Sequence, residues 1–86
     1  MEINKLIELV KEKITKEITI QKINVEDKSF LHEGHKNNSP NKFHIKIIII
    51  SDELKSKKKI DSTKIIYKIL DDELKNYIHS IQLSVN

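Results

Sequence analysis

The fold of this chain is decided by residues 71–85, which read DDELKNYIHSIQLSV. The first half of this stretch ends an amphipathic helix. The second half alternates apolar and polar side chains from Ile81 to Val85, as in a β-strand with one buried face. His79 lies between the two patterns. We therefore predict a helix-to-strand junction that holds His79 on a rigid corner of the molecule.

Two longer segments, residues 2–16 and 60–76, have apolar side chains at helical spacing with charged side chains between them. Both are predicted to be helices. Asp71 can cap a new helical turn, so the second segment is either one helix or two. The apolar residues that define these helices are Ile3, Leu6, Ile7, Val10, Ile14, Ile60, Ile65, Ile66, Ile69, Leu70 and Leu74.

Three shorter segments have the composition of β-strands. They lie at residues 19–27, 44–51 and 80–85. The run from Ile47 to Ile50 is apolar at every position, which predicts a central strand that is buried on both faces. Residues 28–42 carry Gly34, Pro40 and several Asn and Ser residues, so we expect a loop without regular structure there.

The predicted order of elements is α-β-β-α-(α)-β, which is an α+β arrangement. No internal repeat divides the sequence, and residues 1–86 are expected to form one domain. Eight apolar side chains from these elements should meet in one core. They are Ile7, Val10, Ile47, Ile49, Ile66, Leu70, Ile81 and Leu83.

The composition is that of an ordinary folded chain, with 86 residues, 37% hydrophobic and 34% charged. No apolar run approaches the ~20 residues of a membrane span, so we expect a cytoplasmic protein that does not contact a membrane. The absence of cysteine excludes disulfides, thiolate chemistry and metal sites built from cysteine alone. The net charge of +3 permits an acidic partner such as nucleic acid without requiring one.

Sequence motifs give no support for an enzyme. There is no nucleophile with an adjacent base motif, no glycine-rich phosphate loop and no complete metal-hydrolase spacing. Glu33 lies beside His32 and near His35, but a long loop offers these side chains no fixed scaffold. We predict that the chain is not an enzyme.

Histidine is the commonest protein metal ligand, and this chain contains four. His79 has the most rigid setting, whereas His32 and His35 lie in the long loop, where Gly34 allows a tight turn. Each of the three is either a metal ligand or an incidental surface residue. His44 is expected to be a surface residue at the start of its strand.

The chain resembles the BolA family over nearly its whole length. Four stretches carry the resemblance: DKSFLHEGH at residues 27–35, FHIKIIIISD at 43–52, IIYKILDDEL at 65–74 and IHSI at 78–81. They are similar to the family's Asp-x-Ser…His loop, its His-Phe-Lys-Val-x-Val-Ser-Asp strand, its Tyr-x-x-Leu-x-x-Glu-Leu helix and its Val-His-Ala-Leu ending. The resemblance implies a class II KH-like fold, in which helices cover one face of a small mixed three-stranded sheet.

The sequence departs from the family pattern at a few positions. Ser62, Thr63 and Lys64 stand where the family usually has Arg-His-Arg at the start of the long helix. Ser56 replaces a glycine in the preceding turn, and Ile45 replaces an aromatic residue in the central strand. The alanine that follows the last family histidine is Ser80 in this chain. The first departure matters most, because it removes basic residues that feature in arguments for nucleic-acid contact.

The function implied by the resemblance is partnership with a monothiol glutaredoxin in iron–sulfur cluster trafficking or iron regulation. A 2Fe–2S cluster would be shared with the glutaredoxin and glutathione, since imidazoles can replace thiolates on one iron. His79 would be the fixed ligand and either His32 or His35 the loop ligand. His32 matches the family position relative to Ser29, whereas His35 lies closer to the second strand. Alone, the chain is expected to be a monomer without a cofactor.

DNA binding is the alternative function, because the resemblance also implies a transcriptional regulator. The candidate phosphate contacts are Lys55, Lys57, Lys58, Lys59 and Lys64. The same lysines also fit a simple solvated turn, and no aromatic residue accompanies them to stack on bases. We therefore expect any DNA binding to be weak.

Overall fold

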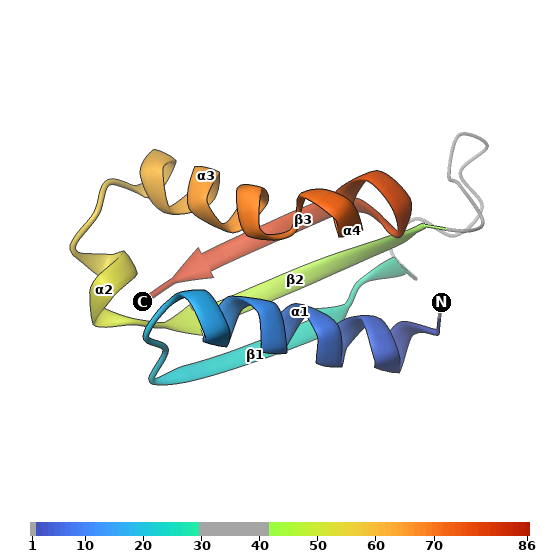
Figure 1. Cartoon of the computed structure of the whole chain (residues 1–86), viewed down its shortest axis with the longest axis horizontal. Coiled ribbons are helices and arrows are strands. Elements are labelled where there is room, and N and C mark those ends of the chain that lie inside the picture. The colour runs from blue at the N-terminus through green and yellow to red at the C-terminus, as the bar shows by residue number, and fades with distance from the viewer. Residues whose placement is uncertain (1, 30–41) are drawn as a thin grey trace.

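The computed structural model describes residues 2–29 and 42–86, which contain four α-helices and three β-strands (Figure 1). In chain order these elements are α1 (Ile3–Glu17), β1 (Lys22–Asp27), β2 (Phe43–Ile50), α2 (Asp52–Lys55), α3 (Lys59–Ile69), α4 (Asp71–Asn76) and β3 (Ile78–Val85). No helix among these residues is both long enough and apolar enough to cross a membrane.

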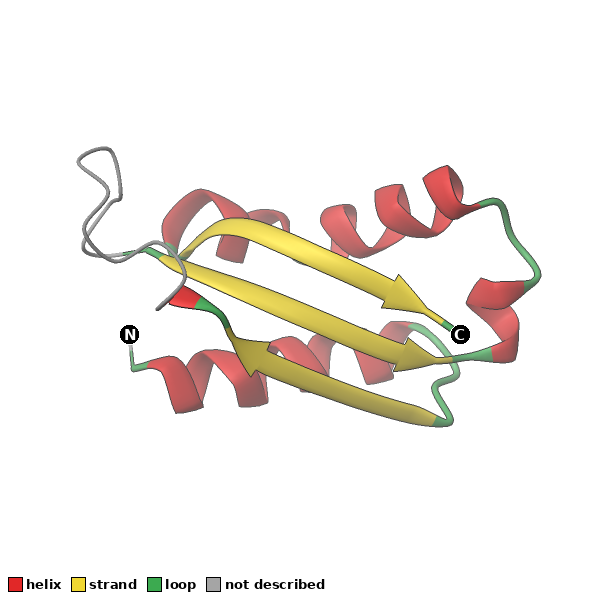
Figure 2. Cartoon of the chain, turned by 180° about the vertical axis from the view of Figure 1, so that it is seen from behind, coloured by secondary structure: helices red, strands yellow, loops and turns green. Residues whose placement is uncertain are grey.

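The three strands form one mixed sheet in the order β1-β2-β3. β1 pairs with β2 in antiparallel fashion, and β2 pairs with β3 in parallel. Figure 2 shows the strands in front of the helices, so that α1, α3 and α4 cover one face, while no helix of the described residues covers the other, which we call the open face. The predictions of an α+β fold, of a mixed sheet with helices on one face and of a central second strand are therefore confirmed.

The core lies between β2 and the helices. Alternate β2 side chains, Ile45, Ile47 and Ile49, point to the helices and are buried, whereas Ile50 on the open face is 42% exposed. Five of the eight predicted core residues are buried, namely Val10, Ile47, Ile49, Ile66 and Leu70. The other three, Ile7, Ile81 and Leu83, are half-buried and pack against this cluster.

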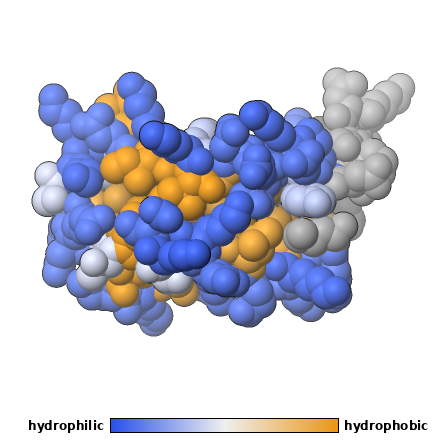
Figure 3. Space-filling model, viewed as in Figure 1, coloured by the Kyte–Doolittle hydropathy of each residue, from blue (hydrophilic) through white to orange (hydrophobic). Residues whose placement is uncertain are grey.

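α1 and α3 do not close completely over the core. A hollow of about 720 Å³ between them is lined by Ile18, Ile65 and Ile69 and has lysines at its rim. Apolar side chains are visible there in the space-filling view (Figure 3).

The helical segment from residue 60 divides at Leu70, so the two-helix alternative is the one observed. The proposed cap is wrong: Leu70 is the N-cap residue, and no side chain caps α4. Asp71 is the first residue of α4 and instead makes an ion pair of 3.0 Å with Lys75, one turn later. Leu70 has φ −99° and ψ 21°, outside helical geometry, while its side chain is fully buried in the core.

α2 was not predicted from the sequence. Its N-cap is Ser51, whose Oγ accepts a hydrogen bond from the Leu54 N–H at 3.2 Å and donates one to the Thr19 carbonyl at 2.8 Å. Because Thr19 is distant in sequence, this short helix depends on a contact made only in the folded chain.

An ion pair ties the first helix to the last. The Lys13 ammonium lies 2.9 and 2.8 Å from the two carboxylate oxygens of Glu73, so it bridges α1 and α4. The Glu73 side chain is only 5% exposed, whereas that of Lys13 is 34% exposed. The hydrogen bond to Glu73 raises the pKa of Lys13 above its ordinary value.

Candidate functional site

His79 occupies a β-bulge at the start of β3. Phe43 pairs with Ile78 and His44 pairs with Ser80, so His79 and Ser80 together oppose the single residue His44. A bulge of this kind redirects a side chain that regular alternation would place elsewhere. It allows Ile78 to be buried on the helix side while His79 and Ser80 are both exposed.

His79 is exposed, as predicted, although its local structure differs slightly from the prediction. β3 begins at Ile78, so His79 is the second residue of the strand and does not precede it. The strand hydrogen bonds therefore fix its backbone, and the bulge determines which face its ring reaches.

His44 is 4% exposed, so the prediction of a surface residue was wrong. Its Nδ1 lies 2.6 Å from Ser80 Oγ, and its Nε2 lies 3.2 Å from Nδ1 of His79. The two imidazole rings meet edge to face, with centroids 4.7 Å apart and an interplanar angle of 79°. A polar ring can be buried at this position because side chains of the neighbouring strand satisfy its nitrogens.

The backbone of His44 is also fixed. Its N–H donates to Ser29 Oγ at 3.1 Å, and the Lys28 N–H donates to its carbonyl at 2.7 Å. The Ser29 N–H in turn donates to a carboxylate oxygen of Asp27 at 2.9 Å. The histidine pair is therefore anchored to all three strands at this end of the sheet.

Among the described residues, only one of the two ring nitrogens of His79 has a partner. Nδ1 contacts His44, whereas no described residue bonds to Nε2, and the side chain is exposed. A neutral imidazole nitrogen with its lone pair directed outward can bind iron or another metal.

Within residues 2–29 and 42–86 no group of three or more His, Cys, Asp or Glu side chains could hold a metal ion. His79 on its own is therefore a single donor. That fits a shared cluster, whose other ligands come from elsewhere, and does not fit a closed metal site within the described part of the chain.

The two loop histidines, His32 and His35, lie outside the described residues. The residues that flank this segment can be placed: Ser29 contacts His44, and Lys42 directly precedes β2. Both flanks are therefore at the end of the sheet that carries His79.

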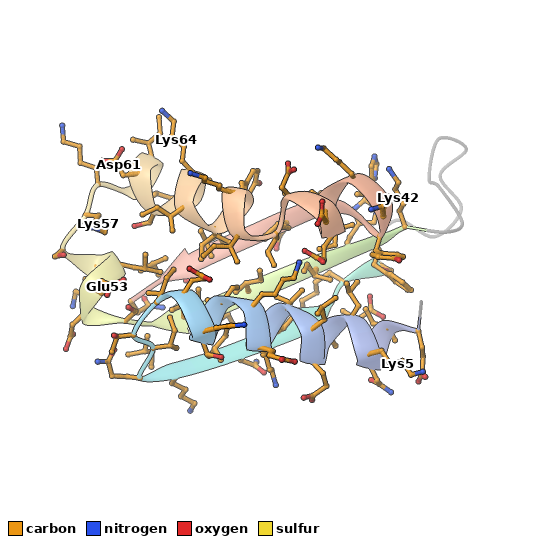
Figure 4. All side chains as sticks on the ribbon, viewed as in Figure 1. Lys5, Lys42, Glu53, Lys57, Asp61 and Lys64 are labelled. Carbon is orange, nitrogen blue, oxygen red and sulfur yellow. The ribbon has the colours of Figure 1, made fainter. Side chains whose placement is uncertain are left out.

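The lysine candidates form a separate surface. Lys55, Lys57, Lys58, Lys59 and Lys64 are all exposed around the connection between α2 and α3. Figure 4 shows Lys57 and Lys64 at one end of the molecule and Lys42, at the start of β2, near the other. A hollow of about 270 Å³ lies beside these lysines, and none of its lining residues is aromatic.

Residues that depart from the family pattern near this turn serve the fold. Ser62 is 2% exposed, and its Oγ donates to the Leu54 carbonyl at 2.9 Å, so it joins α3 to α2. Ser56 has φ −71°, a value that needs no glycine. Of the Ser62-Thr63-Lys64 triplet, Lys64 is the one basic side chain, and it is exposed.

Comparison with known proteins identifies the family. The family model described as BolA-like protein matches residues 14–86. This chain belongs to the BolA family.

Two curated proteins are similar in sequence to this chain. The chain is 30% identical over 76 residues to the DNA-binding transcriptional regulator BolA of Haemophilus influenzae, and the match covers 88% of this chain and 71% of that protein. It is also 30% identical over 79 residues to SufE-like protein 1, chloroplastic/mitochondrial, of Arabidopsis thaliana, covering 86% of this chain. The match spans about a fifth (21%) of the length of that longer relative.

A solved structure agrees with the fold. The BolA domain of SufE1 from Arabidopsis thaliana superposes with a TM-score of 0.80 at 30% identity, covering 94% of this chain and 90% of that domain. The membership that the sequence resemblance predicted is therefore confirmed by sequence and by fold.

Proposed function

We propose that this BolA-like chain co-ligates a 2Fe–2S cluster with a monothiol glutaredoxin and glutathione, and acts in iron–sulfur cluster trafficking or iron regulation. The observation that carries the proposal is the exposed His79, whose Nε2 has no partner among the described residues and whose Nδ1 is held by His44. A ligand that is fixed before binding loses little conformational freedom when it binds.

The ligands that each partner can supply support a cluster shared between this chain, the glutaredoxin and glutathione. Iron–sulfur clusters are usually held by thiolates, which this cysteine-free chain cannot supply, but two imidazoles can replace two thiolates on one iron. The glutaredoxin cysteine and glutathione would supply the thiolates. His79 would supply one imidazole and His32 or His35 the other. In this role the chain binds and hands on a cluster and catalyses no reaction of its own.

The experiment that tests the proposal mixes the purified chain with a cluster-loaded monothiol glutaredoxin and glutathione, and records the visible absorption and circular dichroism spectra. The wild-type chain should change the spectrum, because an imidazole nitrogen replaces a thiolate sulfur on iron. His79→Ala should leave the spectrum of the glutaredoxin cluster unaltered.

Two controls make the result specific. Gln82→Ala changes another exposed β3 residue and should behave as wild type. His79→Ala should stay folded but lose about 1 kcal/mol of unfolding free energy, because it removes a hydrogen-bond partner of the buried His44. If well-folded His79→Ala produces the wild-type spectral change, His79 is not a ligand.

DNA binding is a second candidate function. It is favoured by the five exposed lysines around the α2–α3 connection and by the name of the Haemophilus influenzae relative. We rank it below cluster binding for two reasons. Ser62 stands where the family usually has a basic residue, and its side chain is buried. The hollow beside the lysines is lined by no aromatic residue that could stack on a base. The expected contacts are therefore with phosphates and not with bases.

A further inference from the structure

We propose that His44 is a positioning residue for His79: it accepts a hydrogen bond from the Nδ1–H of His79 and thereby keeps the outward Nε2 unprotonated. The inference rests on the proposed function and adds to it a residue that never touches the cluster. It comes from a chain of three side chains, Ser80, His44 and His79, linked by contacts of 2.6 and 3.2 Å.

Only one hydrogen can lie between the two imidazole nitrogens. The nitrogen that carries the hydrogen in one ring therefore determines which nitrogen carries it in the other ring. If His44 carries its hydrogen on Nδ1, it donates to Ser80 Oγ, and its Nε2 accepts from the Nδ1–H of His79. If His44 carries its hydrogen on Nε2, it donates to His79, and Ser80 donates to His44. Each arrangement satisfies both contacts.

The two arrangements differ at the outer nitrogen of His79. In the first, Nε2 has a free lone pair directed to the exposed side and can bind a metal. In the second, a hydrogen occupies Nε2 and prevents binding. A histidine that ligates a metal ordinarily donates its other ring N–H to an acceptor, which fixes the ring and strengthens the ligand. His44 is placed to be that acceptor.

The surroundings of His44 suit a positioning role. His44 is only 4% exposed, so its ring offers little surface to a partner, and its backbone N–H donates to Ser29 Oγ. The β-bulge places two side chains, His79 and Ser80, beside this one ring. Regular alternation would have placed one of them on the opposite face, so the bulge and the hydrogen-bond chain form a single local arrangement.

The first test needs no cluster. Heteronuclear NMR of the ring nitrogens in the isolated chain, at mildly alkaline pH, reports which nitrogen of His79 carries the hydrogen. We expect the Nδ1–H form to dominate in wild type. In His44→Phe, which keeps a ring but removes the acceptor, the Nε2–H form should dominate. In His44→Gln, whose amide oxygen can accept, the Nδ1–H form should return.

Ser80→Ala provides a variant that does not alter the buried ring. It removes the partner of His44 Nδ1 and should lower the Nδ1–H fraction of His79 without changing the fold, because Ser80 is exposed. If wild-type His79 is mainly in the Nε2–H form, or if folded His44→Phe and folded Ser80→Ala both keep the wild-type form of His79, His44 does not position His79.

The second test uses the mixed complex with cluster-loaded glutaredoxin. His44→Phe should retain the cluster about 10- to 100-fold less well, the usual effect of losing a hydrogen-bond partner of a metal-bound histidine. His44→Gln should recover most of this loss. If the wild-type chain does not change the cluster spectrum, the proposed function fails, whereas the NMR result on the isolated chain still decides the hydrogen-bond arrangement.

Discussion

His79 owes its exposure to a single extra residue in β3. Because His79 and Ser80 both oppose His44, the strand can bury Ile78 and still present an imidazole on the open face. The sequence pattern placed His79 near the helix-to-strand junction, since the end of the helical pattern and the start of alternation are both local features, but it missed that β3 already begins at Ile78.

The partner of His79 could not be predicted in the same way. His44 reaches its neighbours only through the parallel pairing of β2 and β3 and the bulge in that pairing. The register of two strands distant in sequence is not a local property, so His44 looked like an ordinary residue at a strand end. One signal was present: Ser80 replaces the family's alanine and supplies a hydroxyl to His44.

The loop histidines lead to a prediction at the scale of single residues. His32→Ala and His35→Ala should each weaken cluster retention less than His79→Ala, because the remaining loop histidine can partly replace the lost ligand. Loss of cluster absorbance in the presence of an iron chelator measures retention. The double variant should lose as much as His79→Ala, and full retention by that variant would show that neither histidine is a ligand.

At the scale of elements, the patterns predicted α1 and the three strands, left open whether residues 60–76 form one helix or two, and missed α2. The apolar spacing and alternation that revealed the others come from contact with a shared core. α2 has only four residues and depends on the bond from Ser51 to Thr19, which no local pattern records.

The Lys13–Glu73 pair leads to a prediction about stability. Lys13→Met should lower the free energy of unfolding by about 1 kcal/mol, because it leaves the nearly buried Glu73 carboxylate without its partner, while the partial exposure of Lys13 limits the effect. Lys13→Arg, which keeps the charge, should lose less. Urea unfolding at neutral pH measures the difference.

The same pair predicts a dependence on pH. Glu73 raises the pKa of Lys13 in the folded chain, so the contribution of the pair is fully present below the unfolded-state pKa, near 10.5. It is lost as the pH rises through the higher folded-state pKa. Stability should therefore fall above about pH 10.5 more steeply in wild type than in Lys13→Met. If the unfolding free energies of wild type and Lys13→Met fell in parallel as the pH rises, this pair would not contribute to stability as described.

At the scale of the whole molecule, the two candidate surfaces lie at opposite ends of the long axis, which extends 39 Å. The histidine pair lies where β2 and β3 begin, and the lysines lie around α2 and the start of α3 beyond the other end of β2. Variants at one end should therefore leave the other function unchanged.

This separation yields a prediction for DNA. Binding to duplex DNA, followed by fluorescence anisotropy, should be weak, insensitive to sequence and strongly dependent on salt. Replacing Lys57, Lys58 and Lys59 by alanine should reduce the slope of log affinity against log salt by about 3, if each contacts one phosphate. The same variant should bind the cluster-loaded glutaredoxin as wild type does. Tight, sequence-selective binding at physiological salt would reverse the order of the two proposed functions.

Ligation of the cluster by His79 is tested directly by pulsed electron paramagnetic resonance on the reduced mixed complex, with isotope-labelled histidine nitrogens in the BolA-like chain alone. We expect hyperfine coupling from labelled nitrogen bound directly to iron, with the His79 contribution absent in His79→Ala and unchanged in Gln82→Ala. A complex without coupling from the labelled chain, or one whose coupling is the same in His79→Ala, would contradict ligation by His79.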